Sequence, residues 1–204
     1  MPAPLPPAPM RRWFSCHDAM LRHLPNLITL LRIALVVPLC LLILDRQWPQ
    51  ALAVAFIAGA SDALDGFLAK HFGWQSWLGG MLDPLADKLL LTAAFVTLAL
   101  VAAIPAWLTV LIVARDLVIV VGAIGYHALI GRFDAAPTRL SKWTTVVQIA
   151  FVLYTLLRLT QWIAQVPELD AALVALTVAL TLASGLHYVI VWGQRAIMQR
   201  RSRP

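Results

Sequence analysis

The sequence has little charge and almost no cysteine, and each shortage excludes a class of protein. Only 13% of the 204 residues are charged and 61% are hydrophobic, whereas soluble domains carry about 25% charged residues, so the composition is typical of a membrane protein. Cys16 has only His17 beside it, and Cys40 has no ligand-type neighbour. Neither a disulfide framework nor a zinc site is therefore expected.

The sequence also argues against nucleic-acid binding, although the formal net charge is +6. A stacking platform for nucleic acid needs aromatic residues interleaved with basic ones, and the basic residues of this chain are not arranged in that way. Four arginines instead gather in a tail at residues 194–204, directly after an apolar run. A basic tail in that position is typical of the cytoplasmic side of a membrane, where it lies against anionic lipid headgroups.

The first 24 residues are expected to lie outside the membrane-spanning part. Residues 1–10 are a Pro/Ala stretch that cannot form a continuous helix and is expected to be disordered. Residues 11–24 mix aromatic and aliphatic residues with three arginines, a pattern that predicts a short amphipathic helix in the membrane interface. A cleaved signal peptide is not expected, because no small-residue cleavage site follows the first apolar run.

Residues 25–193 carry the long apolar runs. A helix that crosses a bilayer needs about 20 mostly apolar residues, and the segments that qualify are 27–44, 49–70, 82–102, 106–129, 144–163 and 170–192. The predicted fold class is therefore all-α, a polytopic membrane protein with six transmembrane helices after the interfacial helix. Most basic residues fall on one side of this topology, so both termini are predicted to be cytoplasmic, at the inner membrane if the protein is bacterial.

Four aspartates form the candidate functional site. Asp62 and Asp65 are three residues apart near the end of one apolar segment, and Asp83 and Asp87 are four apart at the start of the next. Each pair lies on one face of a helix, and two antiparallel helices can bring the faces together. Converging carboxylates repel unless a cation neutralises them, and hard oxygen ligands select Mg²⁺ or Mn²⁺. Two such ions can clamp both oxygens of an in-line phosphoryl displacement.

Helix capping is the alternative interpretation of these aspartates. Asp83 precedes Pro84, which is predicted to lie in the first turn of its helix, and Asp is a common N-cap residue. Capping explains one or two of the four aspartates. A carboxylate in the middle of a bilayer costs about 2.5–3.5 kcal/mol on insertion scales, so the set as a whole predicts a functional site.

The same stretch carries a specific resemblance. Between Asp62 and Asp87 the residues follow the pattern D-x-x-D-G-x-x-A-K-x8-G-x3-D-x3-D. This pattern resembles the signature of the CDP-alcohol phosphatidyltransferases, except that Lys70 stands where that family usually has Arg. The resemblance implies a six-helix membrane fold, CDP-diacylglycerol as the donor and two metal ions at its diphosphate. It implies Asp62, Asp65 and Asp83 as the main metal ligands, with Asp87 as a further ligand and as the general base for the acceptor hydroxyl.

The resemblance further implies a pocket for the CDP group. Four residues of the motif would line it: Gly66, Ala69, Lys70 and Gly79. Residues 25–29 together with Arg32 are similar to the opening segment of the family. Asn26 and Thr29 in that segment are candidates for contacts with the nucleotide or diphosphate, with helix capping as the alternative.

Two segments beyond the motif bear on the acceptor. Ala114-Arg115-Asp116 and Ser141-Lys142 are more similar to cardiolipin synthases of the mitochondrial type than to phosphatidylglycerophosphate synthases, which usually have Ala-Arg-Glu and Gly-Lys there. The resemblance implies phosphatidyl transfer to phosphatidylglycerol with release of CMP, with glycerol 3-phosphate as the alternative acceptor. The candidates for binding the acceptor phosphate are Arg115, Arg139 and Lys142. A local pair with Asp116 is the alternative for Arg115.

Two functions of other classes remain as alternatives. A cation transporter would use the four carboxylates as an ion site, but they lie toward the helix ends and no inverted repeat accompanies them. A membrane scaffold without chemistry would leave four costly aspartates unexplained. A homodimer is expected from the family resemblance alone.

Overall fold

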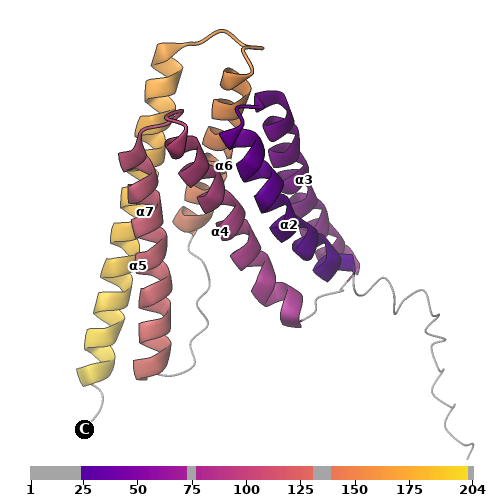
Figure 1. Ribbon diagram of the computed structural model, residues 1–204. Helices are drawn as coiled ribbons and strands as arrows, with labels where there is room; N and C mark the ends of the chain where they lie inside the picture. Colours follow the sequence, from indigo (N-terminus) through magenta and orange to yellow (C-terminus); the bar gives the residue numbers. More distant parts are fainter. Residues whose placement is uncertain (1–23, 73–76, 131–138, 202–204) are drawn as a thin grey trace, which may run out of the picture.

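The computed structural model describes the backbone of residues 24–72, 77–130 and 139–201, and the side chains of residues 29–61, 86–122 and 140–190. Within these residues the chain forms helices joined by turns, with no strand (Figure 1). The helices are α2 (Leu24–Leu44), α3 (Trp48–Phe72), α4 (Trp77–Leu100), α5 (Ala106–Ile130), α6 (Arg139–Leu159) and α7 (Pro167–Arg201). The all-α prediction is confirmed. The predicted interfacial helix falls on residues before α2, outside the described part.

The helices differ from the predicted apolar segments mainly at their polar ends. Helix α4 begins at Trp77 rather than at 82, α6 begins at Arg139 rather than at 144, and α7 continues through the predicted basic tail to Arg201. A hydropathy window stops where polar residues begin, whereas backbone hydrogen bonds carry a helix beyond them. Asp83 and Pro84 therefore lie inside α4. The expectation that Pro84 occupies a first turn, with Asp83 as its cap, is wrong.

Three turns join the helices at one end of the bundle, at residues 45–47, 101–105 and 160–166. Each turn contains a non-glycine residue in the left-handed conformation, with φ of 57° at Arg46, 57° at Ala102 and 62° at Gln161. After α4, the amide of Ala103 donates to the carbonyl of Leu98 at 2.9 Å, the long hydrogen bond of a Schellman-type helix cap. The turns thus satisfy carbonyls that the helix ends would otherwise leave unpaired.

The bundle consists of two groups of helices. Helix α2 packs against both α3 and α4, and α7 packs against both α5 and α6. Contacts of α4 with α5 and of α3 with α6 join the two groups (Figure 1). The core lies toward the turns, where the Phe95 and Phe151 rings stack with centroids 5.9 Å apart. Its largest fully buried apolar side chains are Leu39, Ile43, Phe95, Leu98, Leu108, Ile112 and Leu156.

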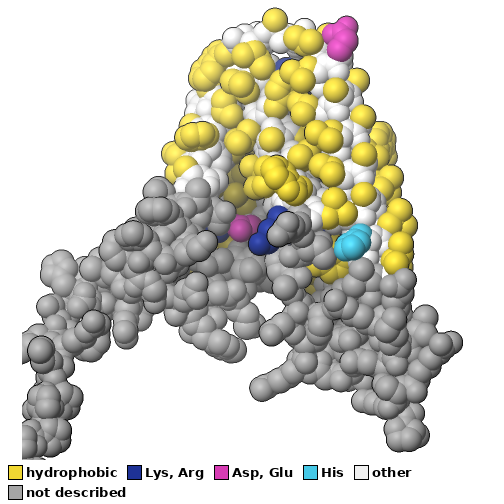
Figure 2. Space-filling view, turned by 180° about the vertical axis from the view of Figure 1, so that it is seen from behind, with side chains coloured by type: hydrophobic (Ala, Val, Ile, Leu, Met, Phe, Trp, Pro, Cys, Tyr) yellow, Lys and Arg dark blue, Asp and Glu magenta, His cyan; other side chains and the backbone are white. Residues whose placement is uncertain are grey.

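The outside of the bundle is covered by apolar side chains. Large exposed ones occur on every helix, and Figure 2 shows them as an almost continuous apolar surface on one face. Among the described residues, two segments are long and apolar enough to cross a membrane, Leu140–Leu159 and Pro167–Ile190, with mean hydropathies of 1.4 and 1.9. Soluble monomers rarely expose apolar patches of this extent, so the surface is suited to contact with lipid.

Candidate active site

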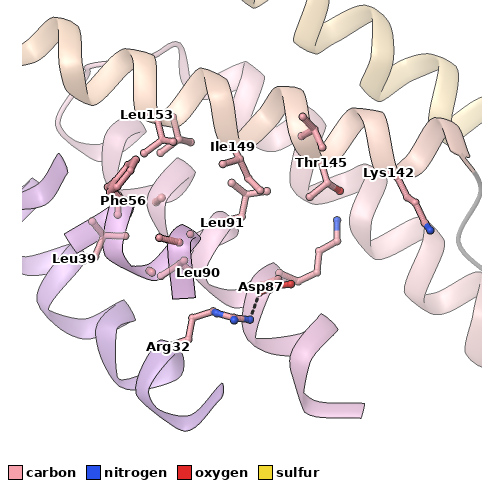
Figure 3. A pocket seen from close by; sticks show the side chains of 18 of the residues that line it. Arg32, Leu39, Phe56, Asp87, Leu90, Leu91, Lys142, Thr145, Ile149 and Leu153 are labelled. Atoms are coloured by element: carbon pink, nitrogen blue, oxygen red, sulfur yellow. Dashed lines mark hydrogen bonds and ion pairs between the residues drawn. The ribbon is translucent and has the colours of Figure 1, made fainter. Parts of the chain in front are cut away.

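A cavity of about 630 Å³ lies between α2, α3, α4 and α6 (Figure 3). Most of its lining is apolar. The polar side chains lie in those parts of the helices that are farther from the three turns: Arg32, Asp87, Lys88, Ser141, Lys142 and Thr145. The cavity therefore has a charged end and an apolar end, as a site for an amphipathic ligand requires.

An ion pair between α2 and α4 lies at the charged end. The Arg32 guanidinium donates to the Asp87 carboxylate at 2.5 Å, an interaction that Figure 3 draws as a dashed line. The Arg32 side chain is fully buried, whereas 38% of the Asp87 side chain is exposed. Because α2 packs along α4, a buried arginine on one helix fixes a carboxylate that remains accessible from the cavity.

A second ion pair extends from the cavity into the bundle. The Lys88 ammonium on α4 donates to both carboxylate oxygens of Asp116 on α5, at 2.7 and 2.8 Å. Lys88 lines the cavity and its side chain is 39% exposed, whereas Asp116 is only 14% exposed. The pair thus joins a cavity-lining cation to a carboxylate that lies behind it.

Arg115 connects the same carboxylate to two further helices. Its guanidinium donates to Asp116 at 2.6 Å, to the Ser141 hydroxyl on α6 at 2.9 Å and to the Ser184 hydroxyl on α7 at 2.5 Å. The Arg115 side chain is only 3% exposed, and it is absent from the described lining of the cavity. The local pair with Asp116, which is the alternative interpretation of Arg115, is present in the structure, together with bonds to α6 and α7.

The apolar part of the cavity opens toward the side of the bundle. Phe56 on α3 and Val146 and Ile149 on α6 line the cavity and are also exposed on the outer surface. Gly59 on α3 lines it as well, and a Cβ at this position would meet no heavy atom within 4 Å. The space beside Gly59 is therefore open.

The four predicted aspartates lie on the two helices α3 and α4. Asp62 and Asp65 fall within α3, and Asp83 and Asp87 fall within α4. The side chains of Asp62, Asp65 and Asp83 lie outside the described ones. Helices α3 and α4 make their extensive contacts with α2, and both line the same cavity. As far as their described residues show, the two helices share a cavity rather than an extensive helix-to-helix contact.

The other predicted site residues are divided between the described and undescribed parts. Lys142 lines the cavity from α6, together with Thr145 (Figure 3). Thr29 is buried on α2, one turn before Arg32, and is not among the lining residues. The remaining residues have side chains outside the described ones: Asn26, Gly66, Ala69, Lys70, Gly79 and Arg139.

The described part of the cavity offers a divalent cation only oxygen ligands. Asp87 supplies a carboxylate, and no described lining residue is a histidine or a cysteine. Nowhere among the described side chains do three Asp, Glu, His or Cys residues come together. An oxygen-only donor set fits Mg²⁺ or Mn²⁺. The site of four aspartates stays a prediction, because three of its members lie beyond those side chains.

Another ion pair, which is partly buried, lies at the turn end, away from this cavity. Arg158 on α6 donates to Asp170 on α7 at 2.5 Å, and the Tyr154 hydroxyl donates to the same carboxylate at 2.8 Å. The pair spans the turn between α6 and α7, because Asp170 lies in the first turn of α7.

Sequence reasoning missed two members of the charged end. Lys88 had a usable signal, since a lysine inside an apolar helix is costly and a partner is expected for it. Ser184 had none, because a serine in an apolar helix bonds as readily to its own backbone. Asp116 was recognised only as a local partner of Arg115, and its bond to Lys88 joins residues 28 positions apart.

Comparison with known proteins gives consistent results. Residues 22–193 match the family model described as CDP-alcohol phosphatidyltransferase. The chain is 37% identical over 166 residues to the cardiolipin synthase (CMP-forming) of Rattus norvegicus. The matched region covers 71% of this chain and 55% of the relative. The chain is 32% identical over 184 residues to the CDP-diacylglycerol–glycerol-3-phosphate 3-phosphatidyltransferase of Bacillus subtilis (strain 168), which covers 81% of this chain and 93% of the relative. The chain thus spans about half the length of the mammalian cardiolipin synthases that it matches.

Proposed function

Because this chain belongs to the CDP-alcohol phosphatidyltransferase family, we propose that it transfers a phosphatidyl group from CDP-diacylglycerol to an alcohol and releases CMP. The observation that carries the proposal is the cavity with one charged and one apolar end. A lipid with a diphosphate headgroup needs both ends. The described residues at and behind the charged end include four cations, Arg32, Lys88, Lys142 and Arg115, and two carboxylates, Asp87 and Asp116. The cations that line the cavity can contact the phosphates of such a lipid.

The reaction is an in-line displacement at the phosphorus that carries diacylglycerol. The acceptor oxygen forms a new bond to this phosphorus, the bond from phosphorus to the CMP oxygen breaks, and CMP leaves with the electron pair. The acceptor hydroxyl must lose its proton, and we assign the proton to the Asp87 carboxylate. General-base help of this kind contributes about 10²–10⁴-fold. Arg32 holds the carboxylate in place at 2.5 Å.

Asp62, Asp65, Asp83 and Asp87 would hold two divalent cations, Mg²⁺ or Mn²⁺. Positions four apart share one face of a helix, and this spacing supports the assignment on both helices. Ala58 lines the cavity from α3 and Asp62 follows it by four residues, while Asp87 lines it from α4 and Asp83 precedes it by four. Such ions neutralise negative charge that develops on the diphosphate oxygens.

The CDP group would lie at the charged end. From the family signature we assign to it the following residues: Asn26, Thr29, Gly66, Ala69, Lys70 and Gly79. The acyl chains of the donor would occupy the apolar part of the cavity and pass between α3 and α6 into the bilayer. The exposed positions of Phe56 and Ile149 at that opening support this route.

Phosphatidylglycerol is our first choice of acceptor, which makes the product cardiolipin. It is supported by the Ala-Arg-Asp segment at residues 114–116 and by the 37% identity to the rat protein named as a cardiolipin synthase. Glycerol 3-phosphate is the second candidate, supported by the Bacillus relative, which the chain covers over 93% of its length. Lys142 lines the cavity and is the described candidate for the acceptor phosphate. Arg139 completes the proposed set, whereas the third predicted residue, Arg115, is bonded to Asp116, Ser141 and Ser184.

The six helices would all cross the membrane. The shortest, α2 and α6, have 21 residues each, about 32 Å at 1.5 Å per residue, and the hydrocarbon core is about 30 Å thick. An even number of crossings leaves both termini on one side. The basic residues of the loops and of the C-terminal tail favour the cytoplasm for that side. A homodimer in the membrane completes the proposal on family grounds.

The test is CMP release by the purified protein in mixed micelles that contain CDP-diacylglycerol and Mg²⁺. Phosphatidylglycerol and glycerol 3-phosphate are supplied separately, with Asp87→Asn and a metal-free sample as controls. Metal-dependent release with phosphatidylglycerol alone would support cardiolipin synthesis, and release with glycerol 3-phosphate alone would support the second candidate. Absence of release with these and with other alcohols would refute phosphatidyl transfer.

A further inference from the structure

Asp116 holds two cations from different parts of the bundle. Its carboxylate accepts from the Lys88 ammonium through both oxygens and from the Arg115 guanidinium through one. Only 14% of the Asp116 side chain is exposed. A carboxylate that is mostly buried and pairs with two cations leaves an excess of one positive charge in the cluster. That charge is available to an anion at the cavity.

Lys88 is the member of this cluster that reaches the cavity. An ammonium group has three N–H donors, and two contacts to Asp116 leave at least one for a ligand. Lys88 follows Asp87 directly in the chain, and both line the cavity. Its ammonium therefore lies in the same cavity as the carboxylate to which the proposed function gives the proton of the acceptor.

Arg115 has a different position. Its guanidinium is bonded to Asp116, Ser141 and Ser184, its side chain is 3% exposed, and it does not line the cavity. For Arg115 to grip a phosphate, these bonds would have to break in a buried place. Arg115 instead connects α5 to α6 and α7 and holds the other side of the Asp116 carboxylate.

We propose that Asp116 is a positioning residue that holds Lys88 for contact with a phosphate group of a substrate. Arg115 holds the Asp116 carboxylate from the other side. The inference rests on the proposed function and deepens it. The contacting group is the Lys88 ammonium. The phosphate belongs to the donor diphosphate or to the acceptor, and separate measurements with the two substrates distinguish these sources.

A purely structural network is the competing explanation, and the chain contains a matched control for it. Arg158 and Asp170 form an ion pair of similar length between α6 and α7 at the turn end. Asp170→Asn removes the same charge from a partly buried pair away from the cavity. If Asp116 only stabilises the fold, Asp116→Asn and Asp170→Asn will differ in melting temperature, but both will keep the KM of the wild type.

The experiment measures kcat and KM for each substrate while the other substrate is saturating. The proteins compared are wild type, Lys88→Gln, Lys88→Arg, Asp116→Asn, the Lys88→Gln/Asp116→Asn double variant and Asp170→Asn. Lys88→Gln is expected to raise KM for one phosphate-bearing substrate about 10- to 100-fold, the range for a lost hydrogen bond between charged groups. Asp116→Asn should raise KM for the same substrate, and the double variant should be no worse than Lys88→Gln alone. Lys88→Arg should recover part of the loss, and Asp170→Asn should leave both KM values within about twofold.

An unchanged KM for both substrates in Lys88→Gln would overturn the inference even if Asp116→Asn does not fold. A double variant whose rise in KM is the product of the two single rises would overturn the link between Asp116 and Lys88.

A second readout keeps the inference separate from the proposed function. It is the rise in melting temperature on adding CDP-diacylglycerol, phosphatidylglycerol or glycerol 3-phosphate. A wild type that releases no CMP refutes the proposed reaction. In that case a ligand-induced rise that is lost in Lys88→Gln and kept in Asp170→Asn supports the phosphate contact, and an equal rise in both refutes it.

Discussion

Gly59→Leu provides a direct test of whether a donor acyl chain occupies the cavity. In the free protein the substitution should cost little, because a Cβ at Gly59 would meet nothing within 4 Å and the cavity measures about 630 Å³. With an acyl chain in place, the added carbons compete for filled space, and overpacking of this kind costs about 1–3 kcal/mol. Because the substitution costs this free energy only when the donor is bound, it weakens donor binding by the same amount. An energy of about 1–3 kcal/mol corresponds to a loss of affinity of about 5- to 150-fold.

The assay is the KM for CDP-diacylglycerol donors of different chain length. Gly59→Leu is expected to raise KM about 5- to 150-fold for a dioleoyl donor and to have a much smaller effect on a dihexanoyl donor, whose short chains leave the space beside Gly59 free. Ala53→Leu is the matched control, because Ala53 is exposed on the same helix and does not line the cavity. It should leave KM unchanged for both donors.

Two results would refute the reasoning. An unchanged KM for the dioleoyl donor in Gly59→Leu would mean that the acyl chain lies elsewhere. A large fall in the melting temperature of Gly59→Leu without ligand would mean that the space beside Gly59 is not open in the free protein. Gly59→Ala should be folded and active, with a gain of about 1 kcal/mol in helix stability from the propensity difference.

Three further predictions concern the core, the metal and the motif. Phe95→Ala should lower the free energy of unfolding by about 3 kcal/mol, since the stacked ring is fully buried. Val96→Ala, on the exposed side of α4, is the control. Thermal unfolding in micelles measures the stability of both variants. Chelation with EDTA or Asp83→Asn should abolish CMP release, and full activity in either sample would contradict the metal assignment. Lys70→Arg should lower the donor KM, because a guanidinium binds phosphate through two hydrogen bonds where an ammonium acts as a point charge; a higher KM would argue against a diphosphate contact.

The helices were largely predictable because their signal is local. Long apolar runs indicate helices wherever they occur, and all six described helices begin within five residues of the predicted start. The exact ends were not predictable, since polar residues such as Arg139, Ser141 and Lys142 at the start of α6 continue the helix by backbone hydrogen bonds. The sequence offered the pair of Arg115 and Asp116 only as the alternative to an acceptor-phosphate site, because neighbouring opposite charges inside an apolar run can serve as partners for each other.

Contacts between distant helices were not predictable in the same way. Arg32 with Asp87 and Lys88 with Asp116 join residues 55 and 28 positions apart, and both depend on how α2, α4 and α5 lie against one another. Spacing within a helix tells which residues share a face, but it does not tell which helix that face meets. For the same reason the packing of α2 against both α3 and α4 could not be derived from the motif, which lies on α3 and α4 and does not include α2.

The left-handed residues in the three turns offer a route to a more robust protein for structural work. Arg46, Ala102 and Gln161 each hold a positive φ, which costs a residue with a Cβ about 1–2 kcal/mol relative to the right-handed region. Glycine adopts that conformation freely. Replacing all three by glycine would relieve conformational strain at one end of the molecule while leaving the cavity and its charged network untouched. The two ends can therefore be engineered separately, one for stability and the other for chemistry.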